Sequence, residues 1–199
     1  MNAFKLRRLV SDARGSTLIE FAFVAPALLV LLLGSFDLAY RAYVESVLQN
    51  TVQKAGRDSA LEGGGTGAAT AAIDAVVRNT MLPVVQNGTF TFTRKNYSSF
   101  TRAGQAEEFT DLNGNGLCDN AEPYSDDNNN STRDTSGNGA GGQGGARDIT
   151  VYTAQVSYPR IVPMYGLLGW SPTVTESATT VLRNQPFGTQ AVRTTRNCA

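Results

Sequence analysis

Apolar positions are concentrated near the start of the chain. Residues 18–36 (LIEFAFVAPALLVLLLGSF) carry one charge, Glu20, and four basic side chains precede them: Lys5, Arg7, Arg8 and Arg14. A helix of this length extends about 28 Å, close to the thickness of a bilayer core, so the segment predicts a transmembrane helix. Because the basic residues lie on its N-terminal side, the positive-inside rule predicts a cytoplasmic N-terminus and an external location for everything after about Asp37.

After Asp37 the apolar residues recur every three or four positions, which is the pattern of an amphipathic helix. We expect the same helix to leave the bilayer and continue to Glu62, with one stripe in a core: Tyr40, Val44, Val47, Leu48, Val52 and Ala55. Glycines 63–65 then end it. A second helix is predicted over residues 68–81, before Pro83, with its own stripe: Ala72, Ile73, Val76, Val77 and Met81.

The remainder of the chain predicts strands. Residues 89–96 and 149–158 alternate in polarity, and residues 174–182 are rich in threonine and valine. We expect these segments to form a small antiparallel sheet covered by the second half of the long helix. Residues 98–147 form a long insertion rich in Gly, Asn and Asp, and its glycine-rich part, residues 137–145, is expected to be flexible. The predicted fold class is therefore α+β.

Composition excludes several classes of function. The 199 residues include 17 basic and 17 acidic side chains, two cysteines and no histidine. A neutral chain has no global field for nucleic acid, and without histidine it has no imidazole base and no zinc site of the usual kinds. We find no acid/base pair, nucleophile elbow or phosphate loop, which argues against an enzyme. The neutral total hides segregation, because residues 98–148 contain nine acidic and three basic side chains.

Three interpretations compete for the N-terminal segment. A secretory signal peptide needs small residues at A-x-A spacing after the apolar run, and the string GSFDLAYRA after Leu33 is a poor match. A plain signal anchor explains the length and orientation but leaves Glu20 without a role. A carboxylate costs about 2.5 to 3.5 kcal/mol at the centre of a membrane helix and less near the interface. The third interpretation supplies a role for it.

The string RGSTLIEF, residues 14–21, resembles the processing site of type IV prepilins and pseudopilins, which a membrane aspartyl peptidase cuts after the glycine. Cleavage after Gly15 would make Ser16 the new N-terminus and Glu20 the fifth mature residue. The wider segment 14–60 resembles the TadE-type pseudopilins of tight-adherence (Tad) pilus systems. The closing strings SYPRIVPMYGLLGW and SATTVLRNQPF resemble the last strands of the same family, with less specificity.

The resemblance implies a non-catalytic minor pseudopilin that takes part in assembling a Tad-type pilus involved in surface adherence. Its partners would be the prepilin peptidase, other pilins and pseudopilins, and the Tad secretion machinery. It would be a single-pass protein of the inner membrane with a periplasmic or extracellular C-terminal domain. The implied segments are a leader (1–15), a transmembrane helix (16–36), its amphipathic continuation (37–65), a helix and strand (66–97), the insertion (98–147) and C-terminal strands (148–199).

Physical chemistry accounts for the glutamate of this motif. A new amino group at Ser16 is a cation at a helix N-terminus, which the helix dipole disfavours, and Glu20 one turn later can neutralise it. In an assembly the partner can be the amine of a neighbouring subunit. Glu20 would then set the register between packed helices.

The insertion contains a second specific pattern. Residues 111–122 (DLNGNGLCDNAE) match the twelve-residue calcium loop of EF-hands. The predicted ligands, with Gly116 at the sixth position, are Asp111, Asn113, Asn115, the carbonyl of Leu117, Asp119 and Glu122. EF-hand helices are not expected, because Pro123 follows at once. The competing interpretation is a solvated turn cluster. With two neutral Asn ligands, we expect weak binding, at about 10⁻⁴ to 10⁻³ M.

A second, degraded copy follows fifteen residues later, since Phe109-Thr110-Asp111 recurs as Tyr124-Ser125-Asp126. It offers four of the oxygen ligands, Asp126, Asn128, Asn130 and Asp134, but has Ser131 for the glycine and Gly137 for the terminal glutamate. Cys118 lies within the first loop and is free to pair with Cys198 outside the cytoplasm. Because Cys198 lies near a chain end that we expect to fray, we expect such a disulfide to matter little.

These loops support an alternative function. The chain would then be a membrane-anchored or secreted calcium-dependent binding or adhesion module, with the insertion as its functional surface. The two functions are compatible with one another.

Overall fold

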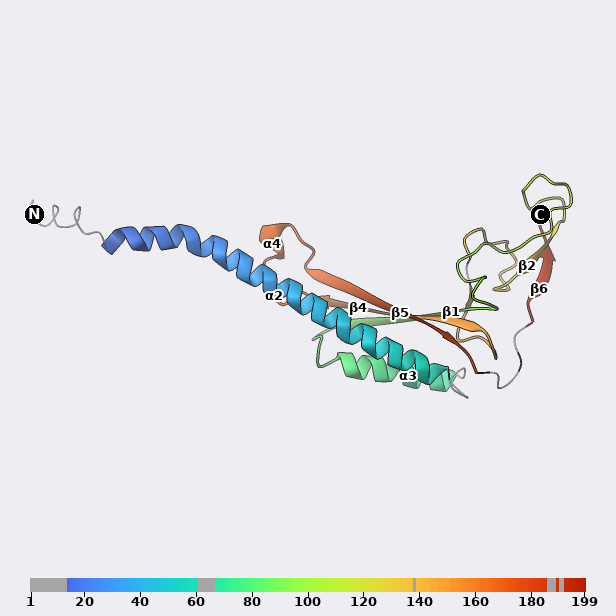
Figure 1. Cartoon of the computed structure of the whole chain (residues 1–199), viewed down its shortest axis with the longest axis horizontal. Coiled ribbons are helices and arrows are strands. Elements are labelled where there is room, and N and C mark those ends of the chain that lie inside the picture. Colours follow the sequence, from blue (N-terminus) through green and yellow to red (C-terminus); the bar gives the residue numbers. More distant parts are fainter. Residues whose placement is uncertain (1–13, 61–66, 138, 186–188, 190–191) are drawn as a thin grey trace, which may run out of the picture. The chain divides into compact units, whose positions relative to one another are not determined.

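A computed structural model describes residues 14–60, 67–137, 139–185, 189 and 192–199 of the chain (Figure 1). The leader proposed for residues 1–15 lies almost entirely outside these residues, as do glycines 63–65. Three helices and six strands follow one another along the described residues: α2 (Arg14–Ser59), α3 (Gly67–Met81), β1 (Thr89–Tyr97), β2 (Pro123–Asp126), β3 (Ala140–Gly141), β4 (Ile149–Pro159), α4 (Tyr165–Leu168), β5 (Thr173–Arg183) and β6 (Thr194–Asn197).

The apolar run and the amphipathic segment form one continuous helix, α2, of 46 residues with Pro26 inside it. It ends at Ser59, three residues before the predicted end at Glu62. The hydroxyl of Ser59 donates to the carbonyl of Gly56 (2.9 Å), and the amide of Ala60 donates to the same carbonyl (3.1 Å). Both bonds satisfy the carbonyl of Gly56, which lies in the last turn of the helix.

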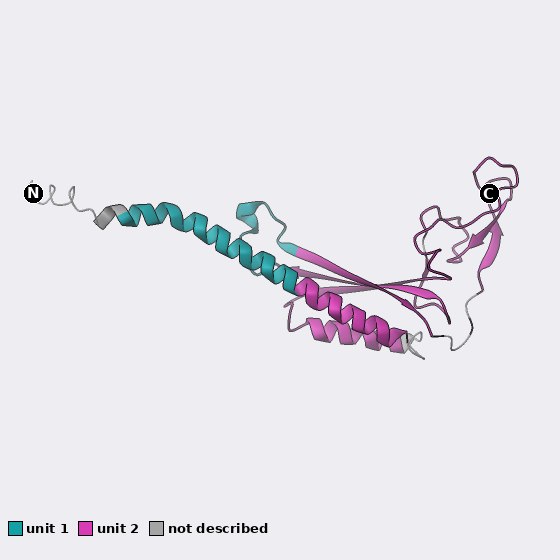
Figure 2. Cartoon of the chain, viewed as in Figure 1, with its two compact units in different colours: residues 1–43, 160–173 teal, residues 44–159, 174–199 magenta. Residues whose placement is uncertain are grey.

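The chain divides into two compact units (Figure 2). Unit 1 contains the residues up to Tyr43 and the segment Arg160–Thr173, and unit 2 contains Val44–Pro159 and Val174–Ala199. Unit 1 consists of the first part of α2 together with the connection that carries α4. Unit 2 holds the core and the insertion.

The core of unit 2 is a four-stranded antiparallel sheet, in the order β3-β1-β4-β5, with two helices on one face. Four of the six residues of the predicted α2 stripe are buried, Val44, Leu48, Val52 and Ala55, whereas Tyr40 and Val47 are half-buried. At Gly56 the helix lies so close to β5 that an added Cβ would be 2.5 Å from the side chain of Thr180. The opposite face of the sheet is rich in exposed or half-exposed threonine, serine and glutamine. The α+β fold class predicted from sequence is confirmed.

Helix α3 packs differently from its predicted stripe. Val77 and Met81 are buried, but Val76 is 52% exposed and Ala72 is also exposed. Asp74 takes part in the packing instead, because its carboxylate binds Arg94 of β1 through two bonds of 2.9 and 2.7 Å. The hydroxyl of Tyr152 on β4 also donates to Asp74 (2.8 Å), so a polar network joins α3 to the sheet.

The insertion contains a short strand ladder and several hydrogen bonds from side chains to its backbone. β2 pairs with β6, so the segment Thr194–Asn197 is held in an antiparallel ladder rather than frayed. In the glycine-rich part, the amide group of Asn96 donates to the carbonyl groups of residues 140–142, and Asn184 donates to those of Gln143 and Gly145. Side-chain amides thus give the backbone of this stretch hydrogen-bond partners that glycine side chains cannot supply. The flexibility expected for residues 137–145 stays a prediction.

Candidate functional site

The proposed processing motif lies at the start of α2. Arg14 is the first helical residue, so Gly15 and Ser16 have helical backbone in its first turn. Glu20 lies in the following turn with an exposed side chain. Within the described residues, α2 is the one helix that is long and apolar enough to cross a membrane. Its apolar segment makes no core: large side chains such as Leu18, Phe23 and Leu31 are exposed.

The first loop of the insertion is wound around the carboxylate of Asp111. This carboxylate accepts hydrogen bonds from the amides of Gly114 (2.6 Å), Asn115 (3.2 Å) and Gly116 (2.8 Å). The bond from Gly116 is the main reason why the pKa of Asp111 lies below its usual value. Gly114 and Gly116 both have positive φ, at 74° and 75°, a backbone conformation that favours glycine. The first position of the predicted loop is thus held as a carboxylate.

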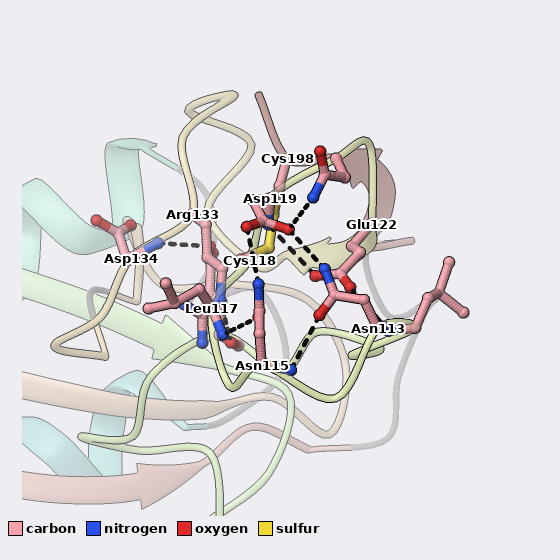
Figure 3. The surroundings of a disulfide bond; sticks show 12 residues. Asn113, Asn115, Leu117, Cys118, Asp119, Glu122, Arg133, Asp134 and Cys198 are labelled. Atoms are coloured by element: carbon pink, nitrogen blue, oxygen red, sulfur yellow. Dashed lines mark hydrogen bonds between the residues drawn. A yellow bond between two sulfur atoms is a disulfide. The ribbon is translucent and has the colours of Figure 1, made fainter.

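Other predicted ligands converge on Asp119 (Figure 3). Asn113 and Asn115 each direct a side-chain amide to this carboxylate, at 3.0 and 2.9 Å. Glu122 closes the loop, because its carboxylate oxygens accept hydrogen bonds from the backbone amides of Leu112 (2.8 Å) and Asp119 (3.3 Å). Glu122 is buried.

Charge in the first loop is one-sided. Its twelve residues include three carboxylates and no basic side chain. The ion pairs within the described residues involve acids outside this loop, such as Asp126, which pairs with Arg196 (2.6 Å). Within the described residues, no three acidic or cysteine side chains are grouped closely enough to hold a metal ion by themselves. A cation in this loop would depend on the Asn side chains and on a backbone carbonyl as well.

The second loop repeats the first in structure. Asp126 accepts the amides of Asn130 (3.0 Å) and Ser131 (2.9 Å), and the side chains of Asn128 and Asn130 both donate to Asp134 (2.6 and 3.0 Å). Ser131 has a φ of 66°, close to that of Gly116 at the equivalent position. The copy therefore keeps the loop conformation although it lacks the glycine. In contrast to the first loop, Arg196 already neutralises its leading carboxylate.

Glu107 closes the second loop and was missed by sequence reasoning. Its two oxygens accept the amides of Asp127 (2.7 Å) and Asp134 (2.9 Å), the second and ninth positions of that loop. Glu122 bonds the same two positions of the first loop. The signal was present in the sequence: Ala106-Glu107 stands fifteen residues before Ala121-Glu122, in the period of the repeat. Gly137, at the twelfth position, does not need to supply an acid.

The two copies are also joined to one another. Phe109 and Tyr124, which occupy equivalent positions in the repeat, form an antiparallel bridge. The amide of Thr110 donates to the carbonyl of Pro123, and the amide of Ser125 donates to that of Glu108, both at 2.9 Å. Each loop is therefore closed by a glutamate next to this bridge.

Cys118 and Cys198 form a disulfide, with their Cα atoms 5.6 Å apart. It links the first loop to the residue that follows β6. The amide of Cys198 also donates to the carbonyl of Glu122 (2.9 Å). The C-terminal segment is thus fastened to the loop by a ladder, a backbone bond and a covalent bond, which differs from the frayed end expected from sequence.

Comparison with known protein families gives one finding. The family model described as TadE-like protein matches residues 15–57, which begin at Gly15 and end within the second half of α2. No curated protein and no solved structure shows a significant match to the chain.

Proposed function

We propose, from the TadE-like protein domain that the chain carries at residues 15–57, that it is a non-catalytic minor pseudopilin cut after Gly15 and assembled into a Tad-type pilus apparatus. The family implies association with Tad pilus machinery and is generally non-catalytic. The apolar helix would anchor the chain in the inner membrane, with its N-terminus cytoplasmic and unit 2 on the far side. Surface adherence would be the role of the assembled pilus.

One coincidence carries this proposal. The family match starts at Gly15, the residue after which the predicted cleavage falls, and it covers the one described helix that is able to span a bilayer. Cleavage there would leave Glu20 one turn from a new α-amino group. Two opposite charges at that spacing can neutralise one another within a helix or between subunits, which suits an apolar bundle. A leader that was simply removed with its apolar segment would have no use for Glu20.

N-terminal sequencing tests the processing step. The full chain is expressed with and without a prepilin peptidase, recovered from membranes and sequenced. We expect Ser16 as the first residue only when the peptidase is present, and we expect Gly15→Val to block the cut. An intact Met1 in the presence of an active peptidase, or a cut after residue 34, would contradict the proposal.

The role of Glu20 needs a separate readout. Glu20→Ala should be cleaved nearly as well as the natural chain but should be depleted from the assembled pilus fraction. Glu45→Ala is the matched control, because Glu45 is an exposed acid of the same helix beyond the apolar run. Equal incorporation of the two variants would remove the proposed register role of Glu20.

We also propose that the two loops of the insertion bind calcium. Five side chains would serve the first loop together with the carbonyl of Leu117: Asp111, Asn113, Asn115, Asp119 and Glu122. In the second loop Asp126, Asn128, Asn130 and Asp134 would be completed by Glu107. The supporting observation is that both loops have the same fold around their first carboxylate and the same glutamate closure. Rotation about the Cβ–Cγ bond exchanges the amide nitrogen and oxygen of Asn, so the same side chains can present oxygen ligands.

Calorimetric titration of the full chain with Ca²⁺ tests this second function. We expect weak sites, at about 10⁻⁴ to 10⁻³ M. Glu122→Gln should remove the first site and Glu107→Gln the second, whereas Glu108→Gln should bind as the natural chain does, because Glu108 is exposed and pairs with Arg102. Absence of binding heat up to several millimolar calcium, or equal binding by all three variants, would reject the calcium function. The processing result would stand in either case.

A further inference from the structure

The connection between β4 and β5 has an exposed apolar surface. Residues 160–173 (RIVPMYGLLGWSPT) contain one charge, Arg160. Ile161 and Leu167 are 63% and 74% exposed, and Trp170 is also exposed. Soluble monomeric proteins rarely expose several large apolar side chains in one short segment unless that segment binds a partner.

The base of this connection is fixed by Arg160. Its guanidinium group binds the carboxylate of Asp37 on α2, and both side chains are nearly buried. The same guanidinium donates from Nε to the carbonyl of Ser171 (2.9 Å) and lies over the ring of Trp170, 4.9 Å from its centroid. The Arg160 amide donates to the carbonyl of Pro172 (3.0 Å), which closes the two ends of the connection.

The anchoring point is informative because of where it falls on α2. Asp37 is the residue immediately after the apolar run, so it marks the height at which the helix would leave the hydrocarbon of the membrane. Figure 2 shows this part of α2 and the α4 segment as one compact unit. Phe36, which precedes Asp37, is itself an exposed apolar residue of the helix. The apolar surface of the connection is thus held at the end of the proposed span.

We propose that residues 161–170 lie in the interfacial layer of the outer leaflet and give the protein a second contact with the lipid. Tyrosine and tryptophan are enriched at this level of membranes, where an amphipathic ring has both an apolar and a polar surrounding. Arg160, which is stacked on Trp170, can keep its charge on the headgroup side of this layer while the side chain of Leu167 enters the acyl-chain side. The absence of any other charge in the connection favours lipid over a polar protein surface. This inference rests on the proposed membrane anchoring of α2.

Trp170 allows a direct test because it is the only tryptophan of the chain. The full chain is reconstituted into phosphatidylcholine and phosphatidylglycerol vesicles that contain lipids brominated either near the headgroup or deep in the acyl chain. We expect shallow bromine to quench Trp170 more strongly than deep bromine. We also expect its emission to move to shorter wavelength than in urea, and aqueous acrylamide to quench it weakly.

Two variants with the tryptophan at another position, both made in Trp170→Phe, provide references for the depth of Trp170 in the bilayer. Leu28→Trp reports the middle of the proposed span and should be quenched best by deep bromine. Leu112→Trp reports the exposed insertion and should respond to acrylamide alone. If Leu28→Trp is not quenched by lipid, the anchoring of α2 fails. If it is quenched while Trp170 is not, only the present inference fails.

Substitutions within the connection distinguish lipid from another protein. Ile161→Ser combined with Leu167→Ser should reduce the quenching of Trp170 by shallow bromine and leave the near-ultraviolet circular dichroism of the tyrosines unchanged. If Trp170 is shielded from acrylamide and from both brominated lipids, and the shielding disappears as protein is diluted in lipid, the surface is covered by a second copy. That result would overturn the proposal.

Discussion

The pair Asp74–Arg94 should be a main determinant of how α3 is held on the sheet. Asp74→Asn keeps the volume of the side chain but removes its charge. Asp74 accepts at two oxygens: Oδ2 from Arg94 (2.9 Å), and Oδ1 from both Arg94 (2.7 Å) and Tyr152 (2.8 Å). In the folded protein the one oxygen of Asn could replace only one of them, and the hydrogen bonds that remain would lose their charge assistance. An Asn amide would also point a donor at the donors of arginine.

The expected magnitude follows from burial. The Arg94 side chain is 8% exposed and that of Asp74 is 20% exposed. Removing one partner of a buried pair costs about 3 to 5 kcal/mol, because the other charge is left without compensation. Partial access of water to Asp74 lowers this cost, so we expect about 3 kcal/mol of lost stability. With a urea slope of roughly 2 kcal/mol/M, the unfolding midpoint should fall by about 1.5 M.

The assay is urea unfolding of the full chain in a non-ionic detergent, followed by the near-ultraviolet circular dichroism of its tyrosines. Asp58→Asn is the matched control, because Asp58 is an exposed acid on α2. The double variant Asp74→Leu with Arg94→Met should be less destabilised than Asp74→Asn, since it leaves neither charge buried alone. If Asp74→Asn and Asp58→Asn shift the midpoint equally, the pair does not hold α3 and the reasoning is refuted.

Three further predictions concern the same unit. Burial, followed by the hydrogen bond to Asp74, raises the pKa of Tyr152 above its ordinary value of 10.0. The unfolded chain therefore loses the phenolic proton of Tyr152 at a lower pH than the folded chain does, so the free energy of unfolding should fall as pH rises above about 10. The urea midpoint should accordingly be lower at about pH 11 than at about pH 9. An added Cβ would meet no atom within 4 Å at Gly116 or at Gly141, so the two sites differ in backbone conformation and not in space. Gly116 has a φ of 75°, so Gly116→Ala should lower the hydrogen-exchange protection of the first loop by about 1 kcal/mol. Gly141→Ala should be near neutral. Replacing both cysteines by serine removes a crosslink between residues 80 positions apart and should lower the free energy of unfolding by about 2 to 4 kcal/mol. Trypsin should then cleave faster after Arg193 and Arg196. Unchanged proteolysis would mean that the β2–β6 ladder alone holds the C-terminal segment.

Periodicity was sufficient to predict the long helix and the three main strands. The stripe from Val44 to Ala55 has the helical spacing of a buried face, and the strands alternate at a period of two. The stripe of α3 was less well predicted. Its packing depends on a polar residue, Asp74, whose partner Arg94 is identified only when β1 is placed beside the helix. Hydrophobic patterns carry no information about such a pair.

The loops show a different limit of sequence reasoning. The first loop carries its own closing glutamate, so a linear motif describes it fully. The second borrows Glu107 from a position that precedes both loops, and a search confined to twelve residues finds Gly137 instead. Pairing of Cys118 with Cys198 was likewise open, because geometry decides it and the β2–β6 ladder that brings the two together was not predicted.

Incorporation into a pilus is the central claim of this account, and a crosslink from the apolar helix tests it most directly. A photoreactive phenylalanine analogue is placed at Phe21, an exposed residue next to Glu20, in cells that assemble the pilus, with Leu112 of the insertion as the control position. We expect light to join Phe21, but not Leu112, to the N-terminal helix of another pilin-like subunit, identified by mass spectrometry of the linked peptide. Crosslinks from Phe21 to lipid alone, in cells with intact pili, would contradict the claim.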